Sequence, residues 1–218
     1  MSKRTQKEVV ISDGGVKLAG ILGLPPKRRG VIAFAHGSGS GRLSPRNTFV
    51  AAALQDAGFA TFLFDLLEEE EELDRRKVFD IGLLADRLLI GVEWLHSERV
   101  TRALKMGYFG ASTGAAAALQ AAAREPVHVA AVVSRGGRPD LAMDYLGMVK
   151  APTLLIVGGD DRPVIPLNRQ AMNALKCVKD LVIIPGATHL FQEPGAIDQV
   201  AKLAVDWFLK YLAPKNKR

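Results

Sequence analysis

A serine between two glycines is the first feature of this sequence that could carry covalent chemistry. Residues 110–114, GASTG, have the pattern G-x-S-x-G and follow the apolar run KMGYF. In enzymes with this pattern the serine lies on a tight turn between a strand and a helix, where its hydroxyl projects from the fold. Ser112 is therefore a candidate nucleophile. The alternative is that Ser112 caps a helix whose alanine-rich face packs against a neighbour.

A serine hydroxyl is a weak nucleophile at neutral pH and needs a neighbouring base, for which the sequence offers four histidines. His189 follows the apolar run LVIIP downstream of the serine and is the best candidate. His36 begins the glycine-rich segment HGSGSG upstream of the serine, and we consider it for substrate binding. His96 ends an amphipathic segment and His128 precedes an apolar run, so we expect both at the surface.

A catalytic histidine needs a carboxylate to orient it, and two adjacent aspartates are available. Asp160 and Asp161 both follow the apolar run TLLIVGG, so from the residues alone either could be the orienting acid. The reaction also needs backbone donors for the developing oxyanion. We expect these to be the N–H groups of Thr113, directly after the serine, and Ser38, with Gly37 or Gly39 as alternatives to Ser38.

Arg135 is the one candidate that hints at a substrate. It follows the apolar run VAAVVS, and its guanidinium could bind an acidic group or a phosphate of the substrate. The alternative is a structural arginine that braces its own loop by pairing with Asp140. A pair between Arg135 and Asp65 is a further alternative.

These candidates must be positioned by the elements that surround them. Apolar runs bounded by turn residues alternate with segments of helical periodicity, which predicts an α/β fold with a mainly parallel sheet and helices on both faces. An antiparallel hairpin with its turn at residues 13–15 is expected to enter the sheet. The expected strands are residues 31–35, 59–64, 103–109, 129–134, 153–158 and 181–185, and the expected helices are residues 49–58, 79–96, a helix beginning at 112, 167–176 and 196–211.

The pattern predicts one domain over residues 1–218, because no composition shift or long linker interrupts it. We expect no cap domain, frayed tails at residues 1–7 and 214–218, and a solvated charged face at LLEEEEELDRRK. In such sheets ligands bind outside the carboxyl ends of the strands. The candidate residues all follow predicted strands, so they are expected to meet at one edge of the sheet.

The composition excludes several classes of protein. The chain is 48% hydrophobic and 24% charged, as in ordinary globular domains, and its apolar runs are too short to cross a membrane. The formal net charge of +6 comes from basic residues at the two ends, without interleaved aromatic residues, which argues against nucleic-acid binding. No apolar signal segment follows the first residues, so we expect a cytoplasmic protein. Cys177 is the only cysteine, so it forms no intrachain disulfide or cysteine metal cluster, and we expect no metal and no cofactor.

The segments around these candidates resemble the α/β-hydrolases, and in particular their small, lidless dienelactone-hydrolase-type esterase domains. The resemblance rests on GASTGAAAAL together with HGSGSGRLSPRN, SRGGRPDLA, TLLIVGGDDRPVIPLN and PGATHLFQEPGA. In that superfamily the acid usually lies in a G-x-D-x-x-V pattern, which selects Asp161, and the chain order is serine, acid, histidine. The namesake dienelactone hydrolases use a cysteine nucleophile, and the serine here favours general ester hydrolysis.

Together these features predict a serine hydrolase that acts on small carboxylic esters through Ser112, His189 and Asp161, with an acyl-enzyme intermediate. A thioesterase or an acyltransferase would use the same residues. From a different class, the chain could be a ligand-binding or interaction module that has kept the hydrolase fold, since a fold does not determine a function. The expected partner is a small-molecule ester, and a homodimer is compatible with the sequence.

Overall fold

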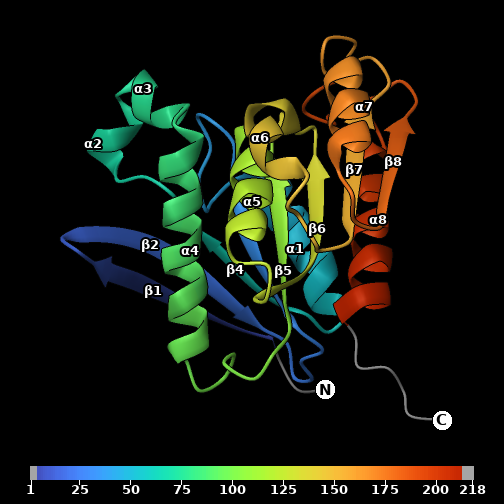
Figure 1. The fold of residues 1–218 in the computed structure, drawn as a ribbon. Coiled ribbons are helices and arrows are strands. Elements are labelled where there is room, and N and C mark those ends of the chain that lie inside the picture. The colour runs from blue at the N-terminus through green and yellow to red at the C-terminus, as the bar shows by residue number, and fades with distance from the viewer. Residues whose placement is uncertain (1–3, 213–218) are drawn as a thin grey trace.

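An eight-stranded sheet forms the centre of residues 4–212, the part of the chain that the computed structural model describes (Figure 1). The strands are β1 (Thr5–Asp13), β2 (Val16–Leu24), β3 (Val31–Ala35), β4 (Ala60–Phe64), β5 (Met106–Ala111), β6 (Val129–Arg135), β7 (Thr153–Gly158) and β8 (Lys179–Ile184). Their order across the sheet is β1-β2-β4-β3-β5-β6-β7-β8. Strands β1 and β2 form an antiparallel hairpin, β2 pairs antiparallel with β4, and all other pairs are parallel. The predicted mainly parallel sheet with an N-terminal hairpin is confirmed.

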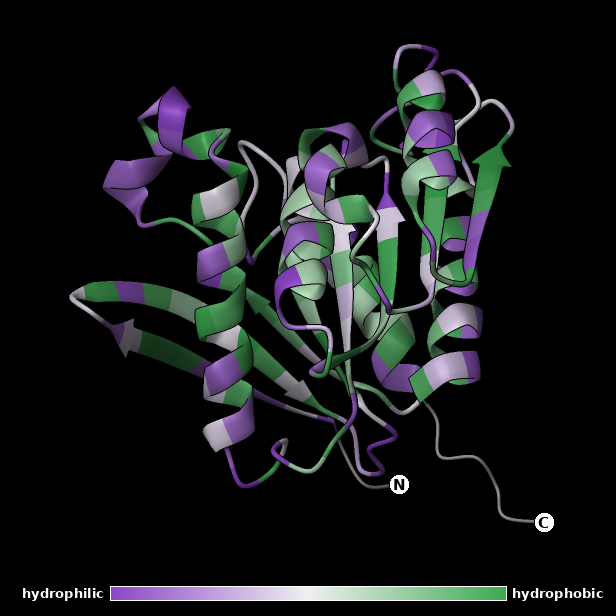
Figure 2. Cartoon of the chain, viewed as in Figure 1, coloured by the Kyte–Doolittle hydropathy of each residue, from purple (hydrophilic) through white to green (hydrophobic). Residues whose placement is uncertain are grey.

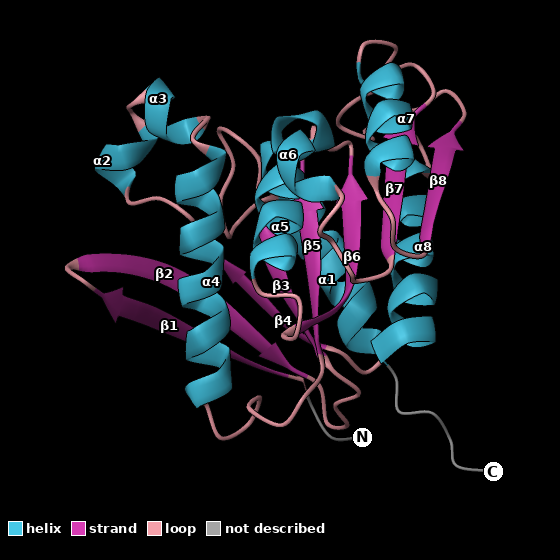
Figure 3. Cartoon of the chain, in the orientation of Figure 1, coloured by secondary structure: helices cyan, strands magenta, loops and turns pink. Residues whose placement is uncertain are grey.

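Helices cover both faces of this sheet, as predicted. They are α1 (Pro45–Asp56), α2 (Glu69–Glu72), α3 (Arg75–Val78), α4 (Ile81–Ser97), α5 (Thr113–Arg124), α6 (Met143–Leu146), α7 (Val164–Ala174) and α8 (Ala196–Leu212), with a short 3₁₀ helix at Pro139–Ala142. Figure 3 shows α4, α5 and α7 in front of the sheet and α1 and α8 behind it. Two hydrophobic clusters correspond to these two layers, one on each face.

The central strands are apolar along their whole length because they are covered on both sides. Every residue of β3, β4, β5 and β7 is buried. Helix α5 is buried from Thr113 to Ala123, between the sheet and α4. Its alanines are small enough to let the helix pack closely against both neighbours. This close packing determines where the segment before α5 lies.

Several predicted boundaries change in the structure. The predicted frayed tail at residues 1–7 is wrong for residues 5–7, which pair with β2 as the start of β1. The other predicted tail, 214–218, lies outside the described residues. Helix α1 begins four residues earlier than predicted, because the Ser44 side chain accepts a hydrogen bond from the Asn47 amide and a proline occupies the first turn. None of the helices in residues 4–212 is long and apolar enough to cross a membrane.

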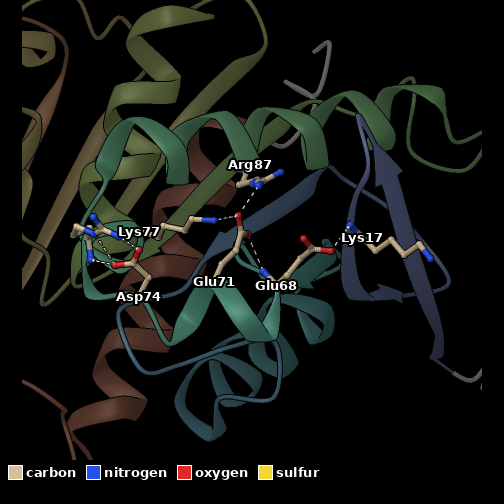
Figure 4. A network of polar contacts seen from close by, with 7 residues as sticks. Lys17, Glu68, Glu71, Asp74, Lys77 and Arg87 are labelled. Carbon is tan, nitrogen blue, oxygen red and sulfur yellow. Dashed lines mark hydrogen bonds and ion pairs between the residues drawn. The ribbon is translucent and has the colours of Figure 1, made fainter.

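A short hydrophilic segment that contains α2 and α3 connects β4 to α4 and projects beside α4 (Figures 1 and 2). Its centre is Glu71, whose carboxylate accepts hydrogen bonds from the Glu68 amide at 3.1 Å, from Lys77 at 2.9 Å and from Arg87 at 3.1 Å (Figure 4). Burial by itself would raise the pKa of Glu71, but these hydrogen bonds and the neighbouring positive charges hold that pKa below its usual value. The predicted solvated face is therefore wrong for Glu71, whose side chain is only 12% exposed. This network ties the segment to α4.

Candidate active site

Ser112 occupies a strained turn between β5 and α5. Its backbone angles are φ 52° and ψ −121°, a conformation that is rare for residues other than glycine and that marks functional turns. The flanking glycines make this turn possible: a β-carbon on Gly110 would lie 2.4 Å from Cα of Ala115, and one on Gly114 would lie 2.2 Å from the carbonyl oxygen of Ala35. The Ser112 side chain forms no capping hydrogen bond to α5, so the alternative role as a helix cap is wrong, although the alanine-rich helix does pack against its neighbours.

The side chains of Ser112, His189 and Asp161 meet at the carboxyl edge of the sheet. Nε2 of His189 lies 3.3 Å from Oγ of Ser112, and Nδ1 lies 2.7 Å from Oδ2 of Asp161. The three residues come from the turns that follow β5, β7 and β8. In the neutral imidazole, the proton on Nδ1 is donated to the carboxylate and Nε2 is free to accept the serine proton. The longer distance to the serine lies in the range common in sites without a bound substrate.

The structure distinguishes the two adjacent aspartates. Asp161 is buried, with 8% of its side chain exposed, and it is the carboxylate that contacts His189. Asp160 is exposed, and its amide donates to the carbonyl of Ala187, which fixes the turn after β7 against the loop that carries the histidine. Two consecutive residues in a tight turn point in different directions, so only one of them can reach the imidazole.

The residues expected to bind an oxyanion lie beside the serine. Gly37 lies directly against it, since a β-carbon on Gly37 would be 2.8 Å from Cβ of Ser112. The N–H of Ser38 donates to the hydroxyl of Thr113 at 3.1 Å. Thr113 begins α5, where the first amides of a helix have no helical carbonyl to bind. The loop after β3 and the start of α5 therefore form one contiguous wall around Ser112.

His36 is placed differently from our expectation. Its ring is buried, Nε2 accepts from the amide of Leu66 at 2.9 Å, and Nδ1 lies 3.0 Å from the carbonyl of Gly37. These contacts use both ring nitrogens of the neutral tautomer, and burial lowers the pKa of His36. The predicted role in substrate binding is therefore replaced by a structural one: His36 attaches the glycine-rich loop to the segment that follows β4.

Arg135 ends β6 and is buried, with 4% of the residue exposed. Its Nη2 donates to Oδ1 of Asn47 at 3.2 Å, and its guanidinium carbon lies 5.9 Å from the ring centroid of Phe191. Burial and, to a lesser extent, the positive charge of Arg46 lower the pKa of Arg135 to about 10, so the guanidinium is still protonated at neutral pH.

Both ion pairs considered for Arg135 are wrong, because other arginines occupy those carboxylates. Arg138 donates two hydrogen bonds to Asp140, at 2.9 and 2.8 Å. Arg42 forms an ion pair with Asp65, and its amide also donates to that carboxylate at 2.7 Å. Each pair stabilises a loop that borders the site.

Sequence reasoning missed two groups that stabilise the surroundings of the nucleophile: one contacts the turn of Ser112 and the other contacts the loop after β6. The amide of Arg138 donates to the carbonyl of Ser112 at 3.0 Å. Asn168 of α7 is buried, and its Nδ2 donates to the carbonyls of Gly137 and Val164, both at 3.0 Å, which ties α7 to the loop after β6. The only sequence signal for Asn168 was a polar residue at a helical position that becomes buried. The contact of Arg138 is made by its backbone amide, so it has no signal in the sequence.

The remaining candidates lie away from this site. His128 is exposed, His96 is half-buried, and their rings contact each other with centroids 5.1 Å apart. Cys177 is half-buried, with its sulfur 3.7 Å from the hydroxyl of Thr153. Within residues 4–212, no group of three or more histidine, cysteine, aspartate or glutamate side chains could hold a metal ion.

Comparison with known proteins places this geometry in a family. The family model described as "Dienelactone hydrolase family" matches residues 18–213. The crystal structure of dienelactone hydrolase from Anabaena variabilis ATCC 29413 is 57% identical and superposes with a TM-score of 0.94, covering 97% of this chain and 100% of that one. Est1E from Butyrivibrio proteoclasticus is 16% identical with a TM-score of 0.78, covering 93% of this chain and 98% of that one, and at that identity it shows the fold alone.

A curated relative from Mycobacterium tuberculosis strain H37Rv is named as a candidate phosphoribosyl transferase. It is 58% identical over 206 residues, which is 94% of this chain and 46% of that protein. The chain thus spans about half the length of these curated relatives. The family match over most of the chain, and the α/β-hydrolase fold that carries it, show that this chain belongs to the dienelactone hydrolase family.

Proposed function

We propose that this chain is a serine hydrolase that cleaves small carboxylic esters through an acyl-enzyme. The observation that carries the proposal is the continuous hydrogen-bonded series from Asp161 through His189 to Ser112, with the serine on a strained turn. Membership of a hydrolase family supports it. A serine in the nucleophile position favours esters in general over the dienelactone of the family's name.

In the first half of the reaction, Oγ of Ser112 attacks the ester carbonyl while Nε2 of His189 takes the serine proton. The buried carboxylate of Asp161 holds the ring and stabilises the imidazolium that forms. The imidazolium then gives its proton to the leaving alcohol, and the serine retains the acyl group. Water repeats the sequence as nucleophile, with His189 as its base, and releases the acid and the free serine.

The oxyanion of each tetrahedral intermediate forms beside the Thr113 amide, at the start of α5. In the proposal the Ser38 amide is the second donor, after exchanging its bond to the Thr113 hydroxyl for one to the oxyanion. Donors that are fixed before the reaction stabilise the developing charge without reorganising, which is often the largest contribution to such catalysis. A thioester or an acyl acceptor other than water would use the same groups.

The decisive experiment compares the parent with Ser112→Ala. We expect the parent to hydrolyse p-nitrophenyl butyrate and to react with a fluorophosphonate at Ser112, detected as a single mass adduct on the peptide that contains this residue. Ser112→Ala should keep the circular dichroism spectrum of the parent and lose kcat by about 10⁶-fold. Turnover by Ser112→Ala at the parent's rate contradicts the mechanism, and a folded parent that neither reacts with the probe nor cleaves any ester favours the ligand-binding alternative.

A further inference from the structure

The edge of the sheet at β1 is open. β1 is the outermost strand, so one side of its backbone pairs with β2 and no strand of residues 4–212 lies on the other side (Figures 1 and 3). Among these residues, no backbone–backbone hydrogen bond joins β1 to any element other than β2. β1 is nine residues long and most of it is exposed. A long exposed edge is a template on which another strand can pair, and proteins normally shield such edges.

The opposite edge of the sheet, at β8, is less accessible to another strand. β8 has six residues, and the carboxylate of Asp180 accepts a hydrogen bond from the amide of Leu181 at 2.8 Å. That amide is therefore already occupied. The two edges of the sheet differ in this respect, because in the described chain no side chain forms a hydrogen bond to the backbone of β1. The open edge at β1 is the one that calls for a partner.

The contacts of β2 determine which backbone groups of β1 point to the open side. In an antiparallel pair, successive residues direct both backbone groups alternately toward the neighbouring strand and away from it. Ala19 lies opposite Val10, and its carbonyl accepts from the amide of Asp65 at 2.9 Å, on the side of β2 away from β1. The N–H and C=O groups of Val10 therefore point to the open edge. By the same alternation, so do those of Glu8 and Ser12.

The side chains of β1 match those of a second copy of the same strand. With a two-fold axis at Val10, an antiparallel pair of two such strands has these opposite residues: Val10 with Val10, Glu8 with Ser12, and Lys7 with Asp13. Residues whose backbone groups point outward then lie opposite one another, as the ladder of hydrogen bonds requires. The pair of Lys7 and Asp13 occurs twice, once on each side of the axis. Opposite charges that face each other across strands stabilise the pairing.

Neighbouring registers lack this match. An axis at Glu8 would place two carboxylates opposite each other, and like charges in that position are destabilising. An axis at Val9 would place Lys7 opposite Ile11, and it would bring no opposite charges together. An axis between two residues would place an outward-facing residue opposite an inward-facing one, so the hydrogen bonds could not form. Charge and backbone direction together select the axis at Val10.

The residues of this register are accessible for pairing. Val10 is 62% exposed, and it lies on the face of the hairpin away from α4, because its neighbour Ile11 is buried in the hydrophobic cluster that includes α4. Lys7 has 60% of its side chain exposed, and its ion pair with Glu98 is long, at 3.9 Å. Asp13 is exposed and takes part in no ion pair within the part of the chain that the structure describes.

We propose that β1 is a dimer interface, where it pairs antiparallel with β1 of a second copy of this chain about a two-fold axis at Val10. Both copies use the same surface, so the assembly closes at two subunits, and the pairing removes the open edge of each sheet. Strands β2, β4 and β3 separate β1 from β5, which precedes Ser112. At the usual strand spacing this is about 19 Å, so we expect each subunit to keep its own independent active site.

The first test measures self-association by sedimentation velocity, with the chain at about 1 to 200 μM. We expect the parent to shift from monomer to dimer over this range. Val10→Lys places two like charges at the axis and should raise the Kd of the dimer about tenfold or more. The matched control is Val178→Lys, which changes a valine of similar exposure, 59%, directly before β8 at the opposite edge of the sheet, and it should keep the Kd of the parent.

The second test exchanges the charges of the proposed pair. Lys7→Glu and Asp13→Lys should each raise the Kd about tenfold or more, since each change makes two opposite-charge pairs into like-charge pairs in the dimer. The double variant restores both pairs with their signs exchanged. Its Kd should return to within about threefold of the parent value. Circular dichroism of each variant checks that the fold is unchanged, and if Val10→Lys does not fold, the exchange of charges decides the question.

The proposal is overturned if the parent remains a monomer at every concentration, or if folded Val10→Lys dimerises as tightly as the parent. A double variant that associates no better than the single variants would overturn it as well. The rate of p-nitrophenyl butyrate hydrolysis per chain should be the same in the parent and in Val10→Lys. A parent that dimerises through β1 but cleaves no ester would overturn the proposed hydrolysis and leave the dimer interface in place.

Discussion

Replacing Gly114 by alanine tests whether the close approach of α5 to β3 positions the nucleophile. The added β-carbon would lie 2.2 Å from the carbonyl oxygen of Ala35 and 2.3 Å from that of His36. A carbon and a carbonyl oxygen need roughly 3.3 Å, so the start of α5 and the end of β3 must separate by about 1 Å. Both contacts are with backbone, so no side-chain rotation can relieve them.

The expected effect on stability is a balance of two terms. Forcing an extra carbon into a packed region costs about 3 kcal/mol or more when backbone must move, whereas alanine in place of glycine within a helix returns about 1 kcal/mol. The net loss of about 2 kcal/mol corresponds to a fall in Tm of roughly 4–8 °C for a domain of this size. Ser112 and the loop that contains Ser38 flank this contact, and a displacement of about 1 Å should lower kcat/KM about 100-fold.

The assay is thermal unfolding by circular dichroism together with hydrolysis of p-nitrophenyl butyrate. Gly147→Ala is the matched control, because its β-carbon would have its nearest neighbour at 4.0 Å, on the flexible side chain of Lys176, and its φ of −66° suits alanine. The control should keep the parent's Tm within about 2 °C and its full activity. If Gly114→Ala also behaves like the parent in both measurements, the packing at this turn does not position the serine and the reasoning fails.

Two further predictions concern groups on either side of the turn. Asp161→Asn should lower kcat about 10⁴-fold while Asp160→Asn changes it little, because only Asp161 contacts the imidazole; equal losses in the two variants would contradict the assignment. Burial lowers the pKa of His36 below its ordinary value of 6.5, so its contribution to stability is complete above that pH and is lost as the pH falls below it. Urea unfolding of the parent and of His36→Gln from pH 8 to 5 tests this. Below pH 6.5 the free energy of unfolding should fall less steeply in His36→Gln than in the parent, by up to about 1.4 kcal/mol per pH unit. Equal slopes in the two proteins would contradict a difference between the pKa values of His36 in the folded and unfolded states.

The alternation of apolar runs and helical segments determined the α/β class, the parallel strands and the edge at which the site lies. These features depend on periodicity and on chain order, which are local properties. Strands β3 and β7 coincide with the predicted residues because each is an uninterrupted buried run between turn residues. The motif around Ser112 could be recognised because its residue types and spacing are local, although only Gly110 is required by contacts within the same turn; Gly114 is required by the carbonyls at the end of β3. The choice of Asp161 over Asp160 came from resemblance, since the residues alone left both open.

Only the tertiary structure decided what each polar side chain touches. His36 follows a buried strand and Arg135 ends one at the predicted edge, yet His36 binds backbone within the fold and the guanidinium of Arg135 lies against the ring of Phe191. Glu71 belongs to a run of five acids, but it alone is enclosed by Lys77 and Arg87. These contacts depend on which segments, distant in sequence, pack next to each other in the fold. Residue type and local spacing do not predict that packing. The hydrogen bond from Arg135 to Asn47, which lies 88 positions earlier in the chain, is the clearest case.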